Sequence, residues 1–206
     1  INAMNVILDD ESPLTAAKRG KDSSMWKSIE AQKNGEADIT LSAGNTGALL
    51  VISRLILKSL ENIDKPALAG LWPSQKATNV VLDLGANIEC SEKNLVDFCI
   101  MGASLHKALF PDEKSKVALL NIGSEELKGN EVIKETYQKL NQMVNEDFEF
   151  KGFIEGNHIM DGDVNVIVTD GFTGNVALKT AEGTANFITS ELKAAMGSTC
   201  LLYTSP

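Results

Sequence analysis

Basic residues are scarce in this chain of 206 residues, which has 19 Lys and Arg against 28 Asp and Glu and a formal net charge of −9. A general nucleic-acid-binding protein needs a basic surface to neutralise phosphates, so this balance argues against that class. It leaves room for a local basic patch that meets an acidic partner. We therefore expect no nucleic-acid partner.

Cysteines and long apolar runs are also few. Cys90, Cys99 and Cys200 form no CxxC pair and no metal-binding spacing. Sparse, odd-numbered cysteines are typical of a reducing cytosol rather than of a disulfide framework. The most apolar stretch, residues 48–60, contains two basic residues and is too short to span a bilayer. We predict a cytoplasmic protein that uses neither a metal ion nor a cofactor.

What the chain does contain is an alternation of strand-like and helix-like segments. Hydrophobic residues make up 43% and charged residues 23%, as in a globular protein with a core. Predicted strands lie at 5–8, 39–43, 67–71, 79–84, 116–122, 148–154 and 164–169, and predicted helices at 12–19, 22–34, 48–60, 92–110, 131–144 and 173–196. These repeated βα units indicate an α/β fold with a mainly parallel sheet and helices on both faces.

The first turn that could bind a ligand lies between a predicted strand at 39–43 and an apolar helix. Its glycines, Gly44 and Gly47, allow a tight turn and the close approach of a ligand. Ser42, Asn45 and Thr46 offer side-chain hydrogen bonds, and the free N–H groups of a helix start favour an anion. Two interpretations remain open for this turn alone: a capped turn without a ligand, or an anion site.

A second turn repeats this logic at residues 166–175, where a β-branched strand runs into a helix. Its candidate ligand-binding residues are Asp170, Gly171, Thr173, Gly174, Asn175 and Lys179. Two such turns in one α/β chain favour an anionic ligand near the carboxyl ends of the strands.

Two further turns follow the strands at 79–84 and 116–122. One carries Asp83 and Asn87; the other carries Lys128 and Asn130 at the entrance to a helix. A lysine at a helix start opposes the helix dipole unless an anion lies between them, so Lys128 is the best single candidate for a phosphate contact. The alternative is a solvated surface lysine. We expect four residues at the carboxyl ends of strands on one edge of the sheet: Ser42, Asp83, Asn121 and Asp170.

Taken together, the turns resemble the phosphate acyltransferase family of bacterial phospholipid synthesis. The matching segments, in order, are 19–25 (RGKDSSM), 42–48 (SAGNTGA), 83–87 (DLGAN), 121–130 (NIGSEELKGN) and 170–179 (DGFTGNVALK). The resemblance implies an α/β fold similar to phosphotransacetylases and isopropylmalate-dehydrogenase-like enzymes, usually as a homodimer. It also implies transfer of a fatty acyl group from acyl carrier protein to inorganic phosphate.

In the implied reaction a phosphate oxygen attacks the thioester carbonyl, so no acyl-enzyme is required. We assign catalytic roles to Lys128, Asn45 and Asn175. Phosphate or substrate binding is assigned to Ser42, Gly44, Thr46, Gly47, Asp83, Asn87, Asn130, Asp170, Gly171, Thr173, Gly174 and Lys179. A nucleotide- or phosphosugar-binding domain is the rival interpretation, although no G-x-G-x-x-G follows a strand. A transferase acting on coenzyme A thioesters is the third.

The resemblance also bears on the two ends of the chain and on its partners. Residues 1–197 are expected to form an incomplete catalytic domain, and residues 198–206 a foreign or disordered tail. The family's membrane-associated hairpin is absent, so any peripheral contact with the inner face of the membrane is expected through missing parts. A basic cluster of Lys18, Arg19 and Lys21 is proposed to meet the acidic carrier protein. We interpret His106, His158, Cys90 and Cys99 as structural or surface residues.

Overall fold

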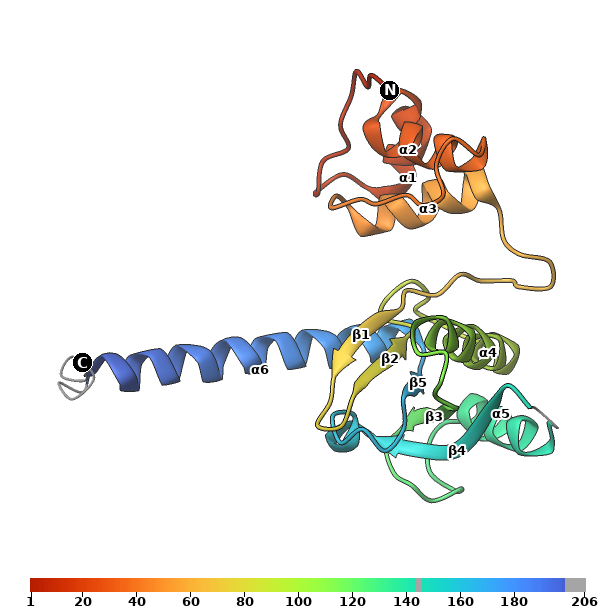
Figure 1. Cartoon of the computed structure of the whole chain (residues 1–206), viewed down its shortest axis with the longest axis vertical. Coiled ribbons are helices and arrows are strands. Elements are labelled where there is room, and N and C mark those ends of the chain that lie inside the picture. The colour runs from red at the N-terminus through yellow and green to blue at the C-terminus, as the bar shows by residue number, and fades with distance from the viewer. Residues whose placement is uncertain (144–145, 199–206) are drawn as a thin grey trace. The chain divides into compact units, whose positions relative to one another are not determined.

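The computed structural model describes residues 1–143 and 146–198. The chain divides into two compact units, Ile1–Pro66 and Ala67–Pro206 (Figure 1). The predicted tail at 198–206 lies, apart from Ser198, outside the described residues. None of the described helices is long and apolar enough to cross a membrane.

The first unit is built from short helices. These are α1 (Pro13–Arg19), the 3₁₀ turn η1 (Gly20–Asp22), α2 (Ser24–Lys33) and α3 (Thr46–Leu57). Pro13 occupies the first turn of α1, where its missing N–H costs nothing. The α2 helix is capped by the Ser23 hydroxyl, which accepts the Trp26 N–H. Helices α1 and α2 pack on α3 around Ile29 and Ile52, both fully buried.

The predicted strands at 5–8 and 39–43 are wrong as strands. Residues 39–43 carry no regular structure, and residues 5–8 contribute only an isolated bridge between Asn5 and Ser23. A strand is defined by its hydrogen-bonded neighbour, and residues 1–66, all of which are described, provide no further ladder partner. The apolar side chains of Ile39 and Leu41 are accordingly 77% and 91% exposed.

The second unit contains a five-stranded sheet in the order β1-β2-β5-β3-β4. The strands are β1 (Gly70–Pro73), β2 (Thr78–Leu82), β3 (Ser115–Asn121), β4 (Phe148–Glu155) and β5 (Val166–Val168). The last four run parallel to one another, and β1 is an antiparallel edge strand on β2. The mainly parallel sheet predicted from the βα alternation is therefore confirmed.

Helices cover both faces of this sheet, as predicted. Side chains alternate along each central strand: Val166 and Val168 face one core, and Ile167 faces the other. The first core contains residues of α4 (Glu92–Leu109) and α5 (Glu131–Gln142). Against the second core pack Ala177, Leu178 and Ala181 from the start of α6 (Gly171–Ser198).

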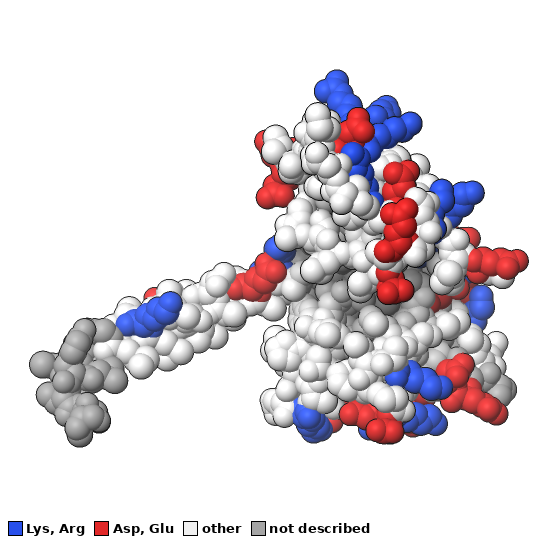
Figure 2. Space-filling model, turned by 45° about the horizontal axis from the view of Figure 1, so that its top comes forward, with Lys and Arg blue, Asp and Glu red and all other residues white. Residues whose placement is uncertain are grey.

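The distal part of α6 extends beyond the sheet of its own unit (Figure 1). Its apolar side chains Phe187, Ile188, Leu192 and Met196 are each more than half exposed. Most of the visible surface of this segment carries neither acidic nor basic side chains (Figure 2). The first third of the helix thus packs on the sheet, and the projecting remainder exposes several apolar side chains.

Candidate functional site

The second unit brings three of the four predicted strand-end residues to one edge of the sheet. Asp83 follows β2, Asp170 comes two residues after β5, and Asn121 ends β3. These three strands are adjacent and parallel, so their carboxyl ends meet. Ser42 is the exception, because it belongs to the first unit and follows no strand.

A cavity of about 550 Å³ lies at this edge. It is lined by Ile88, Glu89, Cys90, Leu95, Asn130, Val132, Ile133, Asp170, Phe172 and Thr173. Residues at or next to the starts of three helices border it: Glu89 and Cys90 precede α4, Asn130 is the N-cap of α5, and Asp170 precedes α6. Helix N-termini favour anions because their first N–H groups lack intrahelical acceptors.

Side-chain caps consume some of these N–H groups and leave others available. Asn130 Oδ1 accepts the Ile133 N–H at 2.9 Å. Asp170 accepts both the N–H and the hydroxyl of Thr173, each at 2.8 Å. The N–H groups of Val132 and Phe172, one position closer to the helix start, have no acceptor within their own helices. The cavity therefore offers main-chain donors to a ligand, while the Asp170 carboxylate is engaged in capping.

Asp83 is completely buried, and its carboxylate organises the turn that follows β2. Its Oδ1 accepts the N–H groups of Leu68, Gly85 and Ala86 at 2.9–3.1 Å. Its Oδ2 accepts the backbone N–H and the side-chain amide of Asn87 at 2.7 and 2.8 Å. These five bonds occupy both oxygens, so the structure gives Asp83 a scaffolding task rather than a ligand contact.

The glycines of the second turn serve close packing. A Cβ on Gly174 would lie 1.9 Å from the backbone oxygen of Asp83, and one on Gly171 would lie 2.6 Å from that of Asn87. The Gly171 N–H donates to this Asn87 oxygen at 2.8 Å. Asn175 also faces the turn, because its side-chain amide donates to the Leu84 carbonyl at 3.3 Å. Close approach of backbone to backbone, rather than of a ligand, accounts for both glycines.

Lys128 lies in the exposed loop between β3 and α5 and is not among the residues that line the cavity. Its carbonyl accepts the Asn121 side-chain amide at 3.1 Å, which ties the loop to the end of β3. Gly129 next to it has φ +95°. The Lys128 side chain is 52% exposed, and its Nζ lies 4.0 Å from Glu125 Oε1. No Lys, Arg or His of the described chain lines the cavity. Lys128 stands two residues before Asn130, which does line it.

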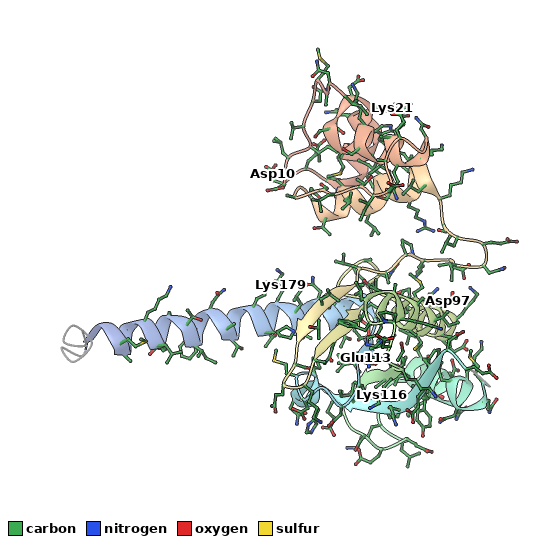
Figure 3. The ribbon with its side chains drawn as sticks, in the orientation of Figure 1. Asp10, Lys21, Asp97, Glu113, Lys116 and Lys179 are labelled. Atoms are coloured by element: carbon green, nitrogen blue, oxygen red, sulfur yellow. The ribbon has the colours of Figure 1, made fainter. Side chains whose placement is uncertain are left out.

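Lys179 lies farther along α6 (Figure 3). Its Nζ pairs with Glu182 at 2.8 Å, and both side chains are largely exposed. This predicted binding residue does not line the cavity either.

The first turn forms a separate group within the first unit. Asn45 caps α3 by accepting the Ala48 N–H at 2.9 Å. Its amide donates to the carbonyls of three loop residues, Leu8, Asp9 and Glu11, at 2.9–3.3 Å. Ser42 Oγ accepts the Gly44 N–H at 3.3 Å, Thr46 is exposed, and a Cβ on Gly47 would lie 2.7 Å from the Pro13 ring.

A second cavity, of about 290 Å³, adjoins this turn. It is lined by Val6, Ile7, Ser24, Met25, Ser28, Leu41, Ser42, Ala43 and Gly44. Only Ser42 and Gly44 of the predicted site residues border it. The predicted residues thus form one group in each unit.

Sequence reasoning missed several residues at the larger cavity. Directly after the cavity-lining residue Cys90, Ser91 and Asn94 form a reciprocal capping box at the start of α4, although neither lines the cavity itself. The spacing of a serine and an amide three residues later could have revealed this cap. Cys90 lines the cavity as a half-buried residue whose thiol donates to the Asn87 carbonyl at 3.8 Å, whereas Cys99 is fully buried and its burial raises the thiol pKa. Phe172 lines the cavity although it is 62% exposed.

Three aspartates near the end of the sheet region, Asp161, Asp163 and Asp170, each have a partner within the protein. Asp161 pairs with His158 at 2.7 Å; this hydrogen bond raises the pKa of His158. Asp163 pairs with Lys76, and Asp170 caps α6 as described above. Among the described residues no group of three or more His, Cys, Asp and Glu side chains is arranged to hold a metal ion.

Solved structures show the same fold. The EutD phosphotransacetylase from Staphylococcus aureus matches 80% of this chain and 56% of its own length, with a TM-score of 0.63 and 17% identity. A branched-chain phosphotransacylase from Enterococcus faecalis V583 matches 76% of this chain and 62% of its own length, with a TM-score of 0.53 and 17% identity. The α/β architecture expected from the resemblance to phosphotransacetylases is therefore confirmed.

Curated relatives are far more similar in sequence. A phosphate acyltransferase of Pelagibacter ubique is 70% identical over 196 residues, and one of Caulobacter vibrioides is 49% identical over 189. These matches cover 95% and 92% of the chain but 59% and 52% of the relatives, so the chain spans little more than half of each. A family model described as fatty acid synthesis protein matches residues 1–202. With the relatives' shared name, this match confirms the resemblance carried by the five motifs: the chain belongs to the fatty acid synthesis protein family.

Proposed function

We propose that this chain carries the anion-binding part of an enzyme that transfers a fatty acyl group from acyl carrier protein to inorganic phosphate, giving an acyl phosphate. One observation carries the proposal: residues at three helix starts border a single cavity at the carboxyl edge of a parallel sheet. Open α/β sheets bind ligands at this edge. The relatives' name, phosphate acyltransferase, supports the reaction class.

The main-chain donors of the cavity suit phosphate. The N–H groups of Val132 and Phe172 have no acceptor within their own helices, and the side chains of Asn130 and Thr173 lie beside them on the cavity wall. Phosphate is already a nucleophile, so one of its oxygens attacks the thioester carbonyl carbon, the C–S bond breaks, and the carrier thiolate leaves. The protein then needs only to hold phosphate close and stabilise the oxyanion that develops.

The negative charge at the cavity supports a catalytic role for Lys128. The cavity wall carries the carboxylates of Glu89 and Asp170 but no cationic side chain, and a bound phosphate adds further negative charge. Lys128 stands two residues before the α5 cap on a loop fixed by Asn121, and its side chain is half exposed. We propose that its ammonium group turns toward the bound phosphate and stabilises the oxyanion.

The turn of the first unit keeps its predicted role in substrate binding as a separate proposal. The start of α3 offers the N–H of Gly47, which has no acceptor within its helix, and the Ser42 hydroxyl borders the smaller cavity. Asn45 and Asn175 both bind backbone carbonyls through their amides, which supports a positioning role for each. We further propose a cytoplasmic homodimer, on the strength of the family resemblance and the sparse cysteines.

The test is a lysine substitution in a full-length relative. In the Pelagibacter enzyme, replacing the residue aligned with Lys128 by Ala should lower acyl phosphate formation by at least about tenfold. The full loss of one preorganised oxyanion donor, roughly 2.7–4 kcal/mol, would lower it about 100- to 1000-fold. The aligned Lys116→Ala variant is the control, because Lys116 lies near the start of β3 at the amino edge of the sheet (Figure 3). Equal turnover of the two variants would return Lys128 to the surface-lysine interpretation.

The same assay tests the donor. Acyl carrier protein thioesters and coenzyme A thioesters are supplied in parallel, each with inorganic phosphate. We expect a clear preference for the carrier protein. Equal or better use of the coenzyme A thioester would favour the third interpretation of the sequence, and no acyl phosphate from either donor would favour a binding domain.

A further inference from the structure

Asp83 is the most heavily hydrogen-bonded side chain near the proposed phosphate cavity, although it does not line it. Its carboxylate is completely buried, which is costly for a charge unless hydrogen bonds compensate. Five N–H donors supply that compensation at 2.7–3.1 Å. Such a concentration of donors on one buried side chain indicates a task beyond filling space.

The five donors come from two separate parts of the second unit. Leu68 lies before β1 and donates its N–H to Asp83 Oδ1, while its carbonyl accepts the Leu84 N–H at 2.9 Å. The other donors belong to Gly85, Ala86 and Asn87 in the turn after β2. The carboxylate thus fastens the turn internally and to the segment that precedes the sheet.

The turn after β2 also holds the start of α6. The Asn87 carbonyl accepts the Gly171 N–H, and the Leu84 carbonyl accepts the Asn175 amide. Residues Ile88 to Cys90, which continue the turn, form one wall of the cavity, and Phe172 and Thr173 at the start of α6 form another. The relative placement of these two walls therefore depends on the conformation that Asp83 imposes.

We propose that Asp83 is a positioning residue for phosphate, one that acts through the turn and the start of α6 without touching the ligand. The inference rests on the proposed function of the cavity. The positioning role predicts the direction in which phosphate binding changes when Asp83 is replaced. Removing a negative charge near an anion should tighten phosphate binding if charge alone mattered, whereas loss of the turn should weaken it.

The experiment compares Asp83→Asn with Asp112→Asn in the 206-residue chain. Asp112 is an exposed aspartate, so its substitution makes the same change in charge away from the turn. The dissociation constant for inorganic phosphate is measured by NMR titration of backbone amides, under conditions where circular dichroism shows each variant to be folded. Asp83→Asn should weaken phosphate about tenfold, the equivalent of losing one hydrogen bond to a charged group, and Asp112→Asn should leave it unchanged.

The experiment distinguishes failure of the positioning role of Asp83 from failure of the proposed phosphate site. If the unmodified chain binds no phosphate, the proposed function of the cavity fails first. If it binds phosphate and the folded Asp83→Asn variant binds equally well or more tightly, the positioning role is overturned. A variant that merely lowers the unfolding temperature, with an unchanged dissociation constant, would leave Asp83 as a folding residue and likewise contradict the proposal.

A second variant keeps the test decisive if Asp83→Asn does not fold. Asn87→Ala removes one of the five donors and leaves its backbone N–H in place. Positioning predicts weaker phosphate binding together with a shifted Gly171 amide resonance, because the Asn87 carbonyl is the acceptor of that N–H. Weaker binding with an unshifted Gly171 resonance would assign Asn87 to direct ligand contact and contradict positioning through the turn.

Discussion

The two units contain nearly the same four-residue turn and support it differently. The first unit has Gly44-Asn-Thr-Gly47 and the second has Gly171-Phe-Thr-Gly174. In the second unit the turn continues from a strand of the sheet, and both glycines lie against backbone atoms. In the first unit an unpaired segment precedes the turn, and a Cβ added to either glycine would meet side chains. On Gly44 it would meet the ends of Met25 and Ser42, and on Gly47 the Pro13 ring.

The helix start also falls at a different place in the two turns. Asn45, one residue after the first glycine, caps α3 through the Ala48 N–H. Asp170, one residue before the first glycine, caps the start of α6 through the Thr173 N–H. The position of the N-cap relative to the first glycine therefore differs by two residues between the two turns. A glycine-rich turn indicates that a helix begins nearby, but the packing around it decides which residue caps the helix and what each glycine contacts.

The largest expected effect would come from filling the glycines of the two turns. Gly174→Ala places a methyl group against the Asp83 carbonyl, so we expect the free energy of unfolding of the second unit to fall by roughly 3 kcal/mol or more. Gly47→Ala meets the Pro13 ring and should cost the first unit about 1 kcal/mol. Gly44→Ala should cost less than about 0.5 kcal/mol, since its nearest neighbour would be 3.4 Å away.

Urea unfolding can follow each unit separately, because Trp26 lies in the first unit and Trp72 in the second. Trp72→Phe leaves fluorescence that reports on the first unit, and Trp26→Phe leaves fluorescence that reports on the second. Equal costs for Gly174→Ala and Gly44→Ala would show that the two turns are supported alike, and would break the comparison.

The second effect in size is a difference in pH dependence, because both histidines lie in the second unit. His106 is buried, and its burial lowers the pKa of the imidazole. The Ser115 hydroxyl donates to the Ala103 carbonyl, so His106 Nδ1 donates to Ser115 Oγ at 3.0 Å. Nε2 carries the lone pair, without a hydrogen-bond partner and 3.8 Å from Glu113. A proton therefore binds the unfolded chain more readily than the folded one.

Because the folded pKa is lowered, stability is complete above the unfolded value of about 6.5 and falls below it, by at most about 1.4 kcal/mol for each pH unit. Urea unfolding at pH 7.5 and 5.5 should show this loss in the second unit and none in the first. His158 has the opposite sign, since Asp161 raises its pKa, but its side chain is 55% exposed and its contribution is small. An unchanged pH slope in His106→Asn would assign the dependence to another group.

A third, smaller effect on stability is expected when the amide cap Asn45 and the carboxylate cap Asp170 are each replaced by the other residue type. Asn45→Asp keeps an oxygen for the Ala48 N–H but turns the amide into an acceptor facing the carbonyls of residues 8, 9 and 11. We expect a loss of about 1 kcal/mol in the first unit. Asp170→Asn retains a good cap and loses only the bond from the Thr173 hydroxyl, so the second unit should lose about 0.5 kcal/mol.

Thermal unfolding followed by each tryptophan measures both cap variants. Loss of stability in the second unit after Asn45→Asp would contradict the assignment of the Asn45 contacts to the first unit alone. A larger cost for Asp170→Asn than for Asn45→Asp would show that the remote carbonyl contacts of Asn45 are energetically unimportant.

Reversing surface charges should have the smallest effect on stability, but a measurable effect on the kinetics with the carrier protein. The first unit has 8 basic and 9 acidic residues, whereas the second has 11 and 19. Lys18, Arg19 and Lys21 of the first unit are exposed (Lys21 is labelled in Figure 3). Replacing the three by Glu, at the aligned positions of the Pelagibacter enzyme, should raise the apparent KM for the acidic carrier thioester and weaken its salt dependence.

A control variant reverses two charges of the second unit, those of Lys114 and Lys116 at the start of β3. Thermal unfolding of both variants checks that the substitutions act on association, since exposed charges change stability by less than about 0.5 kcal/mol. Unchanged carrier kinetics in the first variant would locate the docking surface elsewhere.

Local patterns in the sequence were enough to predict most of the second unit. Alternating βα segments and β-branched strand runs are each recognised within a few residues, and the structure confirms the mainly parallel sheet and the helices on both faces. The strand-end positions of Asp83, Asn121 and Asp170 follow from the same reasoning, because parallel strands end at one edge.

Only the tertiary structure decided what those residues contact. The segment at 39–43 has the composition of a strand but no partner to pair with in its unit, and pairing depends on residues far away in the chain. The carboxylate of Asp83 is occupied partly by Leu68, 15 residues earlier, and Gly174 packs on a carbonyl 91 residues away. A sequence pattern reports the conformation of a short segment, whereas hydrogen bonds and close packing between distant segments form only once the whole unit has folded.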